Sequence, residues 1–178
     1  METTSAILLR KTRFSDTSLI VTWFTSLHGR VKTVVKGALR PKSKFAGTLD
    51  LFFECEIAFV RSAKSEIHTL REAVLREPRE FMRTDFSRVA LGSYFVELME
   101  HATEVEQPAP ELFDLLQRAF AHLDRMPASR RAMLHFEKEL VRLLGIEHPE
   151  LSAIVSLGRA IQRIPFTRPA LLASLKEA

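Results

Sequence analysis

The chain has little cysteine, no long apolar run and no targeting segment. Cys55 is the only cysteine among 178 residues, which excludes an internal disulfide and any zinc site built from several cysteines, and fits a reducing cytosol. No apolar run approaches the ~20 residues needed to span a bilayer, and the N-terminal residues lack the pattern of a signal peptide. We therefore expect a cytoplasmic protein that makes no membrane contact.

Enzyme motifs are also lacking. Six histidines are scattered singly, none at a metal-binding spacing from another, so we expect neither a metal nor a cofactor. Residues 37–43 lack the second glycine of a phosphate-binding loop. Glu54 and Glu56 read as one wet face of a strand, and Cys55 falls on its apolar face, where a thiol is inert. We therefore expect a protein that is not an enzyme.

Positive charge is concentrated in the first half of the chain. Residues 1–76 carry 13 lysines and arginines against 7 acidic residues, whereas residues 77–178 carry 13 against 15. The net charge of +4 therefore conceals a basic first half. Such clustering favours a polyanionic partner such as nucleic acid.

The most basic stretch extends from His28 to Gly47. Its first half alternates as a strand with one packed and one charged face, and its second half, with Pro41 and two glycines, predicts a mobile loop. A solvated strand and a disordered loop would explain the same pattern without a ligand. If nucleic acid is the ligand, we expect phosphate contacts from Arg30, Lys32, Lys36, Arg40, Lys42 and Lys44, with Arg10, Lys11 and Arg13 as an extension.

Aromatic side chains add a second way of holding a single strand. Bases stack on flat rings at about 1–3 kcal/mol per base. Phe14, Trp23, Phe24 and Phe45 lie in or near the basic stretch, although aromatic residues of strands more often belong to the core. Phe45, in the loop, is the best candidate for an exposed ring, and Trp23 is a weaker one.

Five strand-like segments fill the first 77 residues. Alternating or β-branched patterns predict strands at residues 5–14, 19–25, 30–36, 53–59 and 66–74, although the last could also be helical. Five short strands with one long connection match an OB-type barrel in size and strand number, and other small barrels fit as well.

After Glu77 the apolar period changes from 2 to 3.6. The pattern predicts one helix capped by Thr84 or Asp85, a second beginning at Pro110 and a third capped by Ser129, followed by helices at residues 151–164 and 171–176. The expected fold class is therefore α+β. Residues 1–77 would form an OB-type five-stranded β-barrel that binds DNA, and residues 78–178 a C-terminal α-helical domain.

Four segments in a fixed order are similar to one known family. They are AILLRKTRFSDTSLIVTWFTSLHG, VVKGALRPKSKFAGTL, PELFDLLQRAF and LHFEKELVRLLG, which together cover most of the chain. The run from Lys36 to Arg40 and the pair Lys42-Ser43 are similar to the basic loop of that family. In these features the chain resembles the RecO family of bacterial DNA repair and recombination mediators.

This resemblance implies an OB fold, a helical domain and binding of single-stranded and double-stranded DNA at the nucleoid. It also implies strand annealing and, with RecR, loading of RecA onto DNA coated by single-strand binding protein. Many members carry a four-cysteine zinc module after the helix that ends in Leu144-Gly145. Here no cysteine follows, so we expect no zinc and, since TRPALLASLKE still resembles the family's ending, an internally shortened module.

A different class of function fits the same sequence. In this alternative the chain is a protein-interaction adaptor, and its acidic helical half or an edge of the barrel docks partner proteins. DNA binding would then be secondary.

Overall fold

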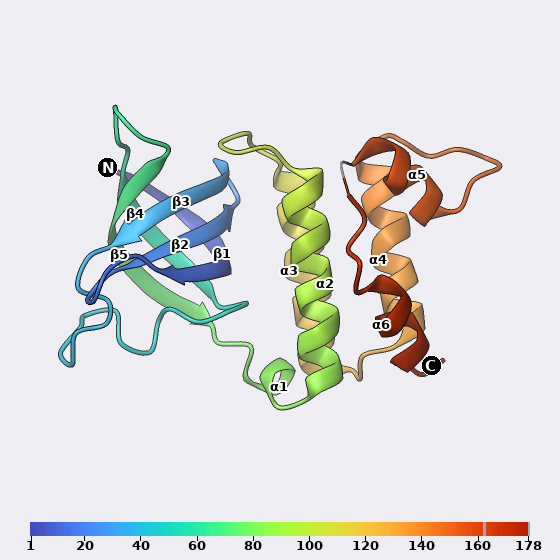
Figure 1. Cartoon of the computed structure of the whole chain (residues 1–178), viewed down its shortest axis with the longest axis horizontal. Helices are drawn as coiled ribbons and strands as arrows, with labels where there is room; N and C mark the ends of the chain where they lie inside the picture. The colour runs from blue at the N-terminus through green and yellow to red at the C-terminus, as the bar shows by residue number, and fades with distance from the viewer. Residues whose placement is uncertain (162, 178) are drawn as a thin grey trace. The chain divides into compact units, whose positions relative to one another are not determined.

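A computed structural model describes residues 1–161 and 163–177 of the chain, without the side chain of residue 81. Strands β1 to β5 are followed by helices α1 to α6 (Figure 1). The chain forms two compact units, Met1–Arg79 with Glu104–Phe113, and Glu80–Thr103 with Asp114–Ala178. Membership of residues 104–113 in the first unit has no signal in the sequence, and the predicted functional boundary after residue 77 stays a prediction.

The first unit is a closed five-stranded barrel. Its strands are β1 (Glu2–Arg13), β2 (Leu19–Thr25), β3 (Gly29–Val35), β4 (Glu54–Val60) and β5 (Ile67–Glu77). They close in the order β1-β2-β3-β5-β4, with β3 and β5 parallel and the other neighbours antiparallel. This arrangement confirms the predicted OB-type barrel and α+β class, and the ambiguous fifth segment is a strand.

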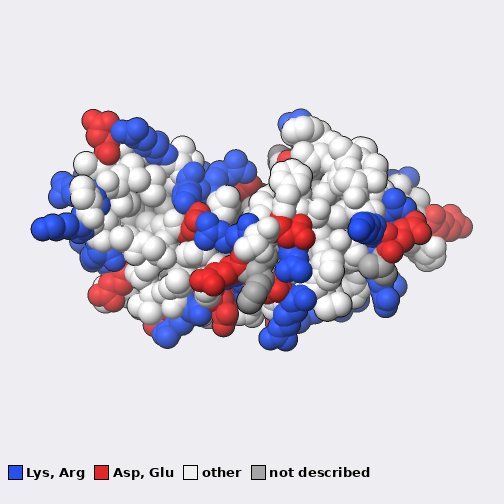
Figure 2. Space-filling view, turned by 90° about the horizontal axis from the view of Figure 1, so that it is seen from below, with Lys and Arg blue, Asp and Glu red and all other residues white. Residues whose placement is uncertain are grey.

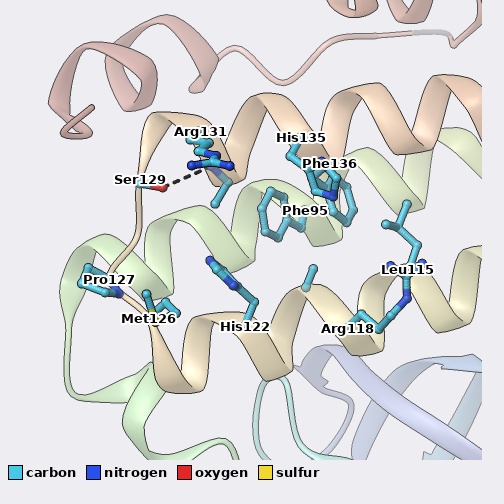
Figure 3. Close-up of a pocket in the computed structure, with 12 residues that line it drawn as sticks. Phe95, Leu115, Arg118, His122, Met126, Pro127, Ser129, Arg131, His135 and Phe136 are labelled. Atoms are coloured by element: carbon cyan, nitrogen blue, oxygen red, sulfur yellow. Dashed lines mark hydrogen bonds between the residues drawn. The ribbon is translucent and has the colours of Figure 1, made fainter. Parts of the chain in front are cut away.

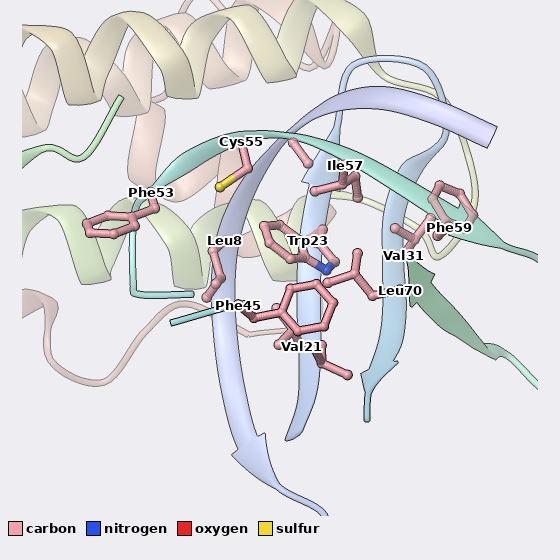
Figure 4. Packing of buried hydrophobic residues seen from close by; sticks show 12 residues of the cluster. Leu8, Val21, Trp23, Val31, Phe45, Phe53, Cys55, Ile57, Phe59 and Leu70 are labelled. Atoms are coloured by element: carbon pink, nitrogen blue, oxygen red, sulfur yellow. The ribbon is translucent and has the colours of Figure 1, made fainter. Parts of the chain in front are cut away.

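Alternation along the strands fills the barrel with apolar side chains. In β3 the buried positions Val31, Thr33 and Val35 alternate with partly exposed ones, as the period of two requires. Trp23 lies at the centre of the cluster shown in Figure 4, fully buried, and its indole N–H donates to Thr33 Oγ1 at 2.9 Å. A buried indole needs such an acceptor, because an unpaired polar group in a core is costly.

Residues 104–113 cover one end of the outer face of β2 and β3. The backbone N–H of Glu106 donates to the carbonyl oxygen of Arg30 at 2.9 Å. The rings of Phe24 and Phe113 pack with centroids 5.9 Å apart, which explains why Phe24 is buried although it lies on the outside of the barrel. Within the first unit, residues 104–113 therefore cover the part of this face near Phe24 and Arg30.

An ion-pair network fastens the same segment to the barrel. Arg61 donates through Nε to Glu2 at 2.5 Å and through a terminal nitrogen to Glu106 at 2.6 Å. His68 Nε2 lies 2.6 Å from Glu106, and the backbone N–H of Ser62 donates to His68 Nδ1 at 3.3 Å. The hydrogen bond from Arg61 holds the pKa of Glu2 below its ordinary value, so this carboxylate is ionised and paired at neutral pH.

Three helices begin where the sequence predicts, at Phe86, Pro110 and Arg130. Asp85 accepts a hydrogen bond from the backbone N–H of Ser87 at 2.8 Å, and Ser129 accepts one from Ala132 at 3.1 Å, so both predicted caps are confirmed. The helices are α1 (Glu80–Arg83), α2 (Phe86–Ala102), α3 (Pro110–Arg125), α4 (Arg130–Leu143), α5 (Ala153–Ala160) and α6 (Arg168–Ser174). Helix α1 is not among the predicted helices, α5 is shorter at both ends than the predicted 151–164, and α6 lies at Arg168–Ser174 instead of 171–176. Residue 162 lies outside the described residues.

Aromatic packing and one buried carboxylate hold these helices together. The rings of Phe95 on α2 and Phe136 on α4 stack with centroids 4.0 Å apart. Glu137 of α4 accepts hydrogen bonds from the Tyr94 hydroxyl at 2.6 Å and from Arg168 Nε of α6 at 2.7 Å. Burial, and then the bond to Glu137, raise the pKa of Tyr94, so its hydroxyl stays a donor. No helix in the described part of the chain is long and apolar enough to cross a membrane.

Gly29 offers a test of the contact between residues 104–113 and the barrel. Its φ is +64°, and a Cβ there would fall on the carbonyl oxygen of Gln107. Gly47 has a φ of +77°, and nothing lies within 4 Å of a Cβ built there. Gly47→Ala should therefore lose only the free energy of the backbone strain, about 1–2 kcal/mol, without a steric clash. We expect Gly29→Ala to lower the urea midpoint of unfolding clearly more than Gly47→Ala. Equal losses would contradict the described contact.

Candidate nucleic-acid interface

Two loops leave the barrel at the same end. In the register of the sheet Arg13 pairs with Leu19, and Leu19 pairs with Val35. The end of β1, the start of β2 and the end of β3 therefore form one row across the sheet. The turn at residues 14–18 and the long basic loop at residues 36–53 continue from this row, so both are at one end of the barrel.

The outer face of β2 and β3 carries positive charge next to these loops. Thr22 of β2 pairs with Arg10 of β1 on one side and with Lys32 of β3 on the other. Thr22 and Lys32 point out of the barrel, because Val21, Trp23 and Val31 beside them belong to its core. Arg10 is exposed, whereas Thr22 between the two cations is buried. OB folds bind oligonucleotides on this face of strands 2 and 3, so the position of Arg10 and Lys32 suits a polyanion.

The basic loop is anchored to the barrel at several points. The backbone N–H of Leu39 donates to the carbonyl oxygen of Thr17 at 3.0 Å. Lys44 Nζ donates to the carbonyl oxygen of Arg71 at 2.6 Å, and the next residue, Phe45, is buried in the barrel core. A loop is present where the sequence predicts one, but it is a series of hydrogen-bonded turns anchored to the barrel, whereas the sequence predicts a mobile loop.

Four of the predicted phosphate contacts are available for an anion. Within residues 1–161 and 163–177, the side chains of Lys32, Lys36, Arg40 and Lys42 have no ion-pair or hydrogen-bond partner. In the space-filling view, lysine and arginine side chains project along the left margin of the first unit (Figure 2). Positive charges that no carboxylate neutralises are the ones that attract phosphates most strongly.

The other predicted cations have structural contacts. Lys11 pairs with Asp50 at 2.7 Å, and Arg13 pairs with Asp16 at 3.0 Å. Lys44 holds the loop through Arg71, as described above, and its Nζ also lies 5.1 Å from the centroid of the Phe45 ring. The carbonyl oxygen of Arg30 accepts the hydrogen bond from the backbone N–H of Glu106. The predicted set therefore divides into free cations and cations that brace the barrel or its loops.

The aromatic prediction is wrong in its choice of residues. Phe45 has an exposed fraction of 5% and Trp23 of 0%, so neither ring can meet a base in this structure. Phe45 closes the barrel core from the loop, and Trp23 points inward because of its place in the alternation of β2. Phe14, in the turn after β1, is 61% exposed.

The reading of Glu54 and Glu56 as one wet strand face is also wrong. Glu54 is buried and pairs with Arg79 at 2.9 Å, next to a register shift between Glu54 and Cys55. Glu56 pairs with Arg76 at 3.2 Å near the surface. Cys55 is buried as predicted, and burial, with the nearby charge of Glu54, raises its pKa to about 12. No group of three potential metal ligands comes together among the described residues.

A groove in the second unit was not predicted. It has a volume of about 520 Å³, and Phe95, Leu115 and Phe136 contribute apolar surface to it (Figure 3). Exposed basic and imidazole side chains also line it, namely Arg118, His122, Arg131 and His135. They occur as two pairs with a spacing of four residues, on α3 and α4, and this spacing was the available signal in the sequence.

Comparison with known proteins gives matches over both units. The family model described as Recombination protein O N terminal matches residues 1–79, and the one described as Recombination protein O C terminal matches residues 83–172.

Individual relatives match over most of this chain. The DNA repair protein RecO of Rhodopirellula baltica is 33% identical over 158 residues, 89% of this chain and 58% of the relative. That of Desulfatibacillum aliphaticivorans is 30% identical over 162 residues, 90% and 62% of the two chains. That of Salinibacter ruber is 31% identical over 144 residues, 80% and 55% of the two chains. The chain therefore spans little more than half the length of these relatives.

Phe45→Ala tests whether barrel packing holds the basic loop. Removing a buried phenylalanine costs about 3–5 kcal/mol, whereas an exposed phenylalanine such as Phe166, 76% exposed, should cost less than about 0.5 kcal/mol. We also expect trypsin to cleave after Lys42 faster in Phe45→Ala than in Phe45→Leu, which keeps most of the volume. Unchanged stability and cleavage in Phe45→Ala would show that the loop is not anchored by this side chain.

Proposed function

The chain belongs to the RecO family, and from this premise we propose that it is a recombination mediator that binds single-stranded and double-stranded DNA and catalyses no reaction. The observation that supports this most is the group of free cations on β3 and the loop that follows it in an OB-type barrel, namely Lys32, Lys36, Arg40 and Lys42. A polyphosphate backbone is held by many such point charges and needs no shaped pocket.

The same charges supply a mechanism for strand annealing. Two complementary strands repel one another through their phosphates, and a surface that holds both at once lowers this repulsion. Because the loop is anchored, its charges are already in place before DNA arrives, and little ordering is needed on binding. Loading of RecA onto DNA coated by single-strand binding protein, together with RecR, completes the proposal, with the nucleoid as the place of action.

Salt-dependent titration with fluorescent single-stranded DNA tests the interface. If the four free cations each neutralise a phosphate, log K should fall with log salt at a slope near −3, from about −0.7 per phosphate. Arg40→Ala/Lys42→Ala should reduce the magnitude of this slope by about 1.4.

A matched control removes two exposed cations from the second unit. Arg125→Ala/Lys138→Ala changes the net charge by the same amount, and neither side chain has an ion-pair partner among the described residues. We expect the slope of this variant to equal that of the wild type. Equal effects of the two double variants would refute a localised interface and leave only general charge attraction.

The groove of the second unit supports a second candidate function, docking of partner proteins. Its apolar surface and its four basic or imidazole side chains complement a peptide that carries both acidic and apolar residues. We propose an acidic segment of a partner protein as the occupant, with RecR and single-strand binding protein as the partners to examine. Binding of DNA and docking of partners can coexist, since they use different residues.

Charge reversal at Arg131 tests docking. A glutamate would place like charge against an acidic segment, so Arg131→Glu should weaken capture of purified single-strand binding protein or RecR by at least about tenfold. Lys138→Glu, on the same helix but not among the lining residues of the groove, should leave capture unchanged. If Arg131→Glu captures the partner protein as well as the wild type does, the groove is not the docking site. If Arg40→Ala/Lys42→Ala still captures the partner, docking does not depend on the DNA-binding cations.

A further inference from the structure

Phe14 is the exposed aromatic residue of the first unit. Its exposed fraction is 61%, while each of the other aromatic side chains of this unit is buried: Trp23, Phe24, Phe45, Phe52, Phe53, Phe59 and Phe113. An apolar ring of this size in water is unfavourable, because burial would remove its surface from solvent. The ring is thus available to a ligand with a flat apolar face.

The turn that carries Phe14 is fixed by hydrogen bonds. The backbone N–H groups of Phe14 and Ser15 both donate to the carbonyl oxygen of Ser18, at 3.0 and 3.2 Å. Thr17 in the same turn accepts the hydrogen bond from Leu39 of the basic loop at 3.0 Å. The turn and the basic loop are therefore joined directly. Because the backbone that carries the ring is already ordered, binding of a ligand there costs little conformational entropy.

Cations that can hold phosphates lie on the segments next to this turn. Phe14 follows Arg13 at the end of β1, and Lys36 follows Val35 at the end of β3, in the same row of the sheet. Lys36 and Arg40 belong to the anchored loop and have no partner for their side chains in the part of the chain that the structure describes. Proteins that hold single strands combine exposed aromatic rings, on which the bases stack, with cations that hold the backbone, and this turn and the loop joined to it carry both kinds of side chain.

We propose that Phe14 stacks against an unpaired base of single-stranded DNA. This rests on the proposed DNA-binding function and adds a preference for one form of the substrate. The ring faces of bases inside a duplex are already covered by neighbouring base pairs, so duplex DNA can use the cations but not the ring. Phe14 therefore favours single strands, and the free cations bind both forms.

Titration of Phe14→Ala with a fluorescent oligothymidylate and with a labelled duplex tests the proposal. We expect affinity for the single strand to fall about tenfold, the loss of one stacked base, and affinity for the duplex to change less than twofold. The salt slope should stay that of the wild type, because no charge is removed. Phe14→Trp should retain single-strand affinity, whereas Phe14→Leu, apolar but not aromatic, should behave as Phe14→Ala.

Exposed phenylalanines of the second unit provide the control. Phe86→Ala and Phe166→Ala, with exposed fractions of 86% and 76% in the wild type, should bind both DNAs as the wild type does. Equal losses for single strand and duplex in Phe14→Ala, or a loss only in capture of a partner protein, would overturn the stacking role. If the wild type binds DNA with the expected salt slope and Phe14→Ala binds equally well, the stacking role is refuted and the proposed function stands. If the wild type binds no DNA, the proposed function itself is refuted.

Discussion

Packing of the barrel interior determines where the positive charges lie. Phe45 enters the core from the basic loop, Lys44 beside it is hydrogen bonded to Arg71, and Leu39 is tied to the turn after β1. A loop of eighteen residues between β3 and β4 would otherwise sample many conformations, at an entropic cost on binding. Because burial of Phe45 anchors the loop, packing inside the barrel fixes where the positive charges of the loop lie on the surface.

The cations of the first unit serve two different purposes. Lys11, Arg13 and Lys44 have contacts within the protein, and exposed pairs of this kind contribute only about 0–1 kcal/mol each to stability. Their value is in positioning the loop and the turn. Lys32, Lys36, Arg40 and Lys42 have no such contacts among the described residues, so their charge remains available to a ligand. A count of basic residues alone cannot separate these two groups, since both are lysine and arginine in one stretch.

Local patterns in the sequence predict the elements well, because those patterns have local causes. Alternation in β3 and the caps Asp85 and Ser129 report backbone geometry that neighbouring residues impose. The failures have tertiary causes. Burial of Phe45 depends on the open end of the barrel, Glu54 meets Arg79 across 25 positions, and residues 104–113 join a unit from which the helix α2 separates them. The groove between α3 and α4 likewise needs both helices in place before its basic pairs converge.

Lysine footprinting is the most direct test of the central claim, that DNA occupies the free cations of β3 and the basic loop. The chain would be acetylated at low reagent concentration with and without saturating single-stranded DNA, and each lysine quantified by mass spectrometry. The account predicts strong protection of Lys32, Lys36 and Lys42, and no protection of Lys138 on α4. Equal protection of all four lysines, or protection of Lys138 alone, would contradict it.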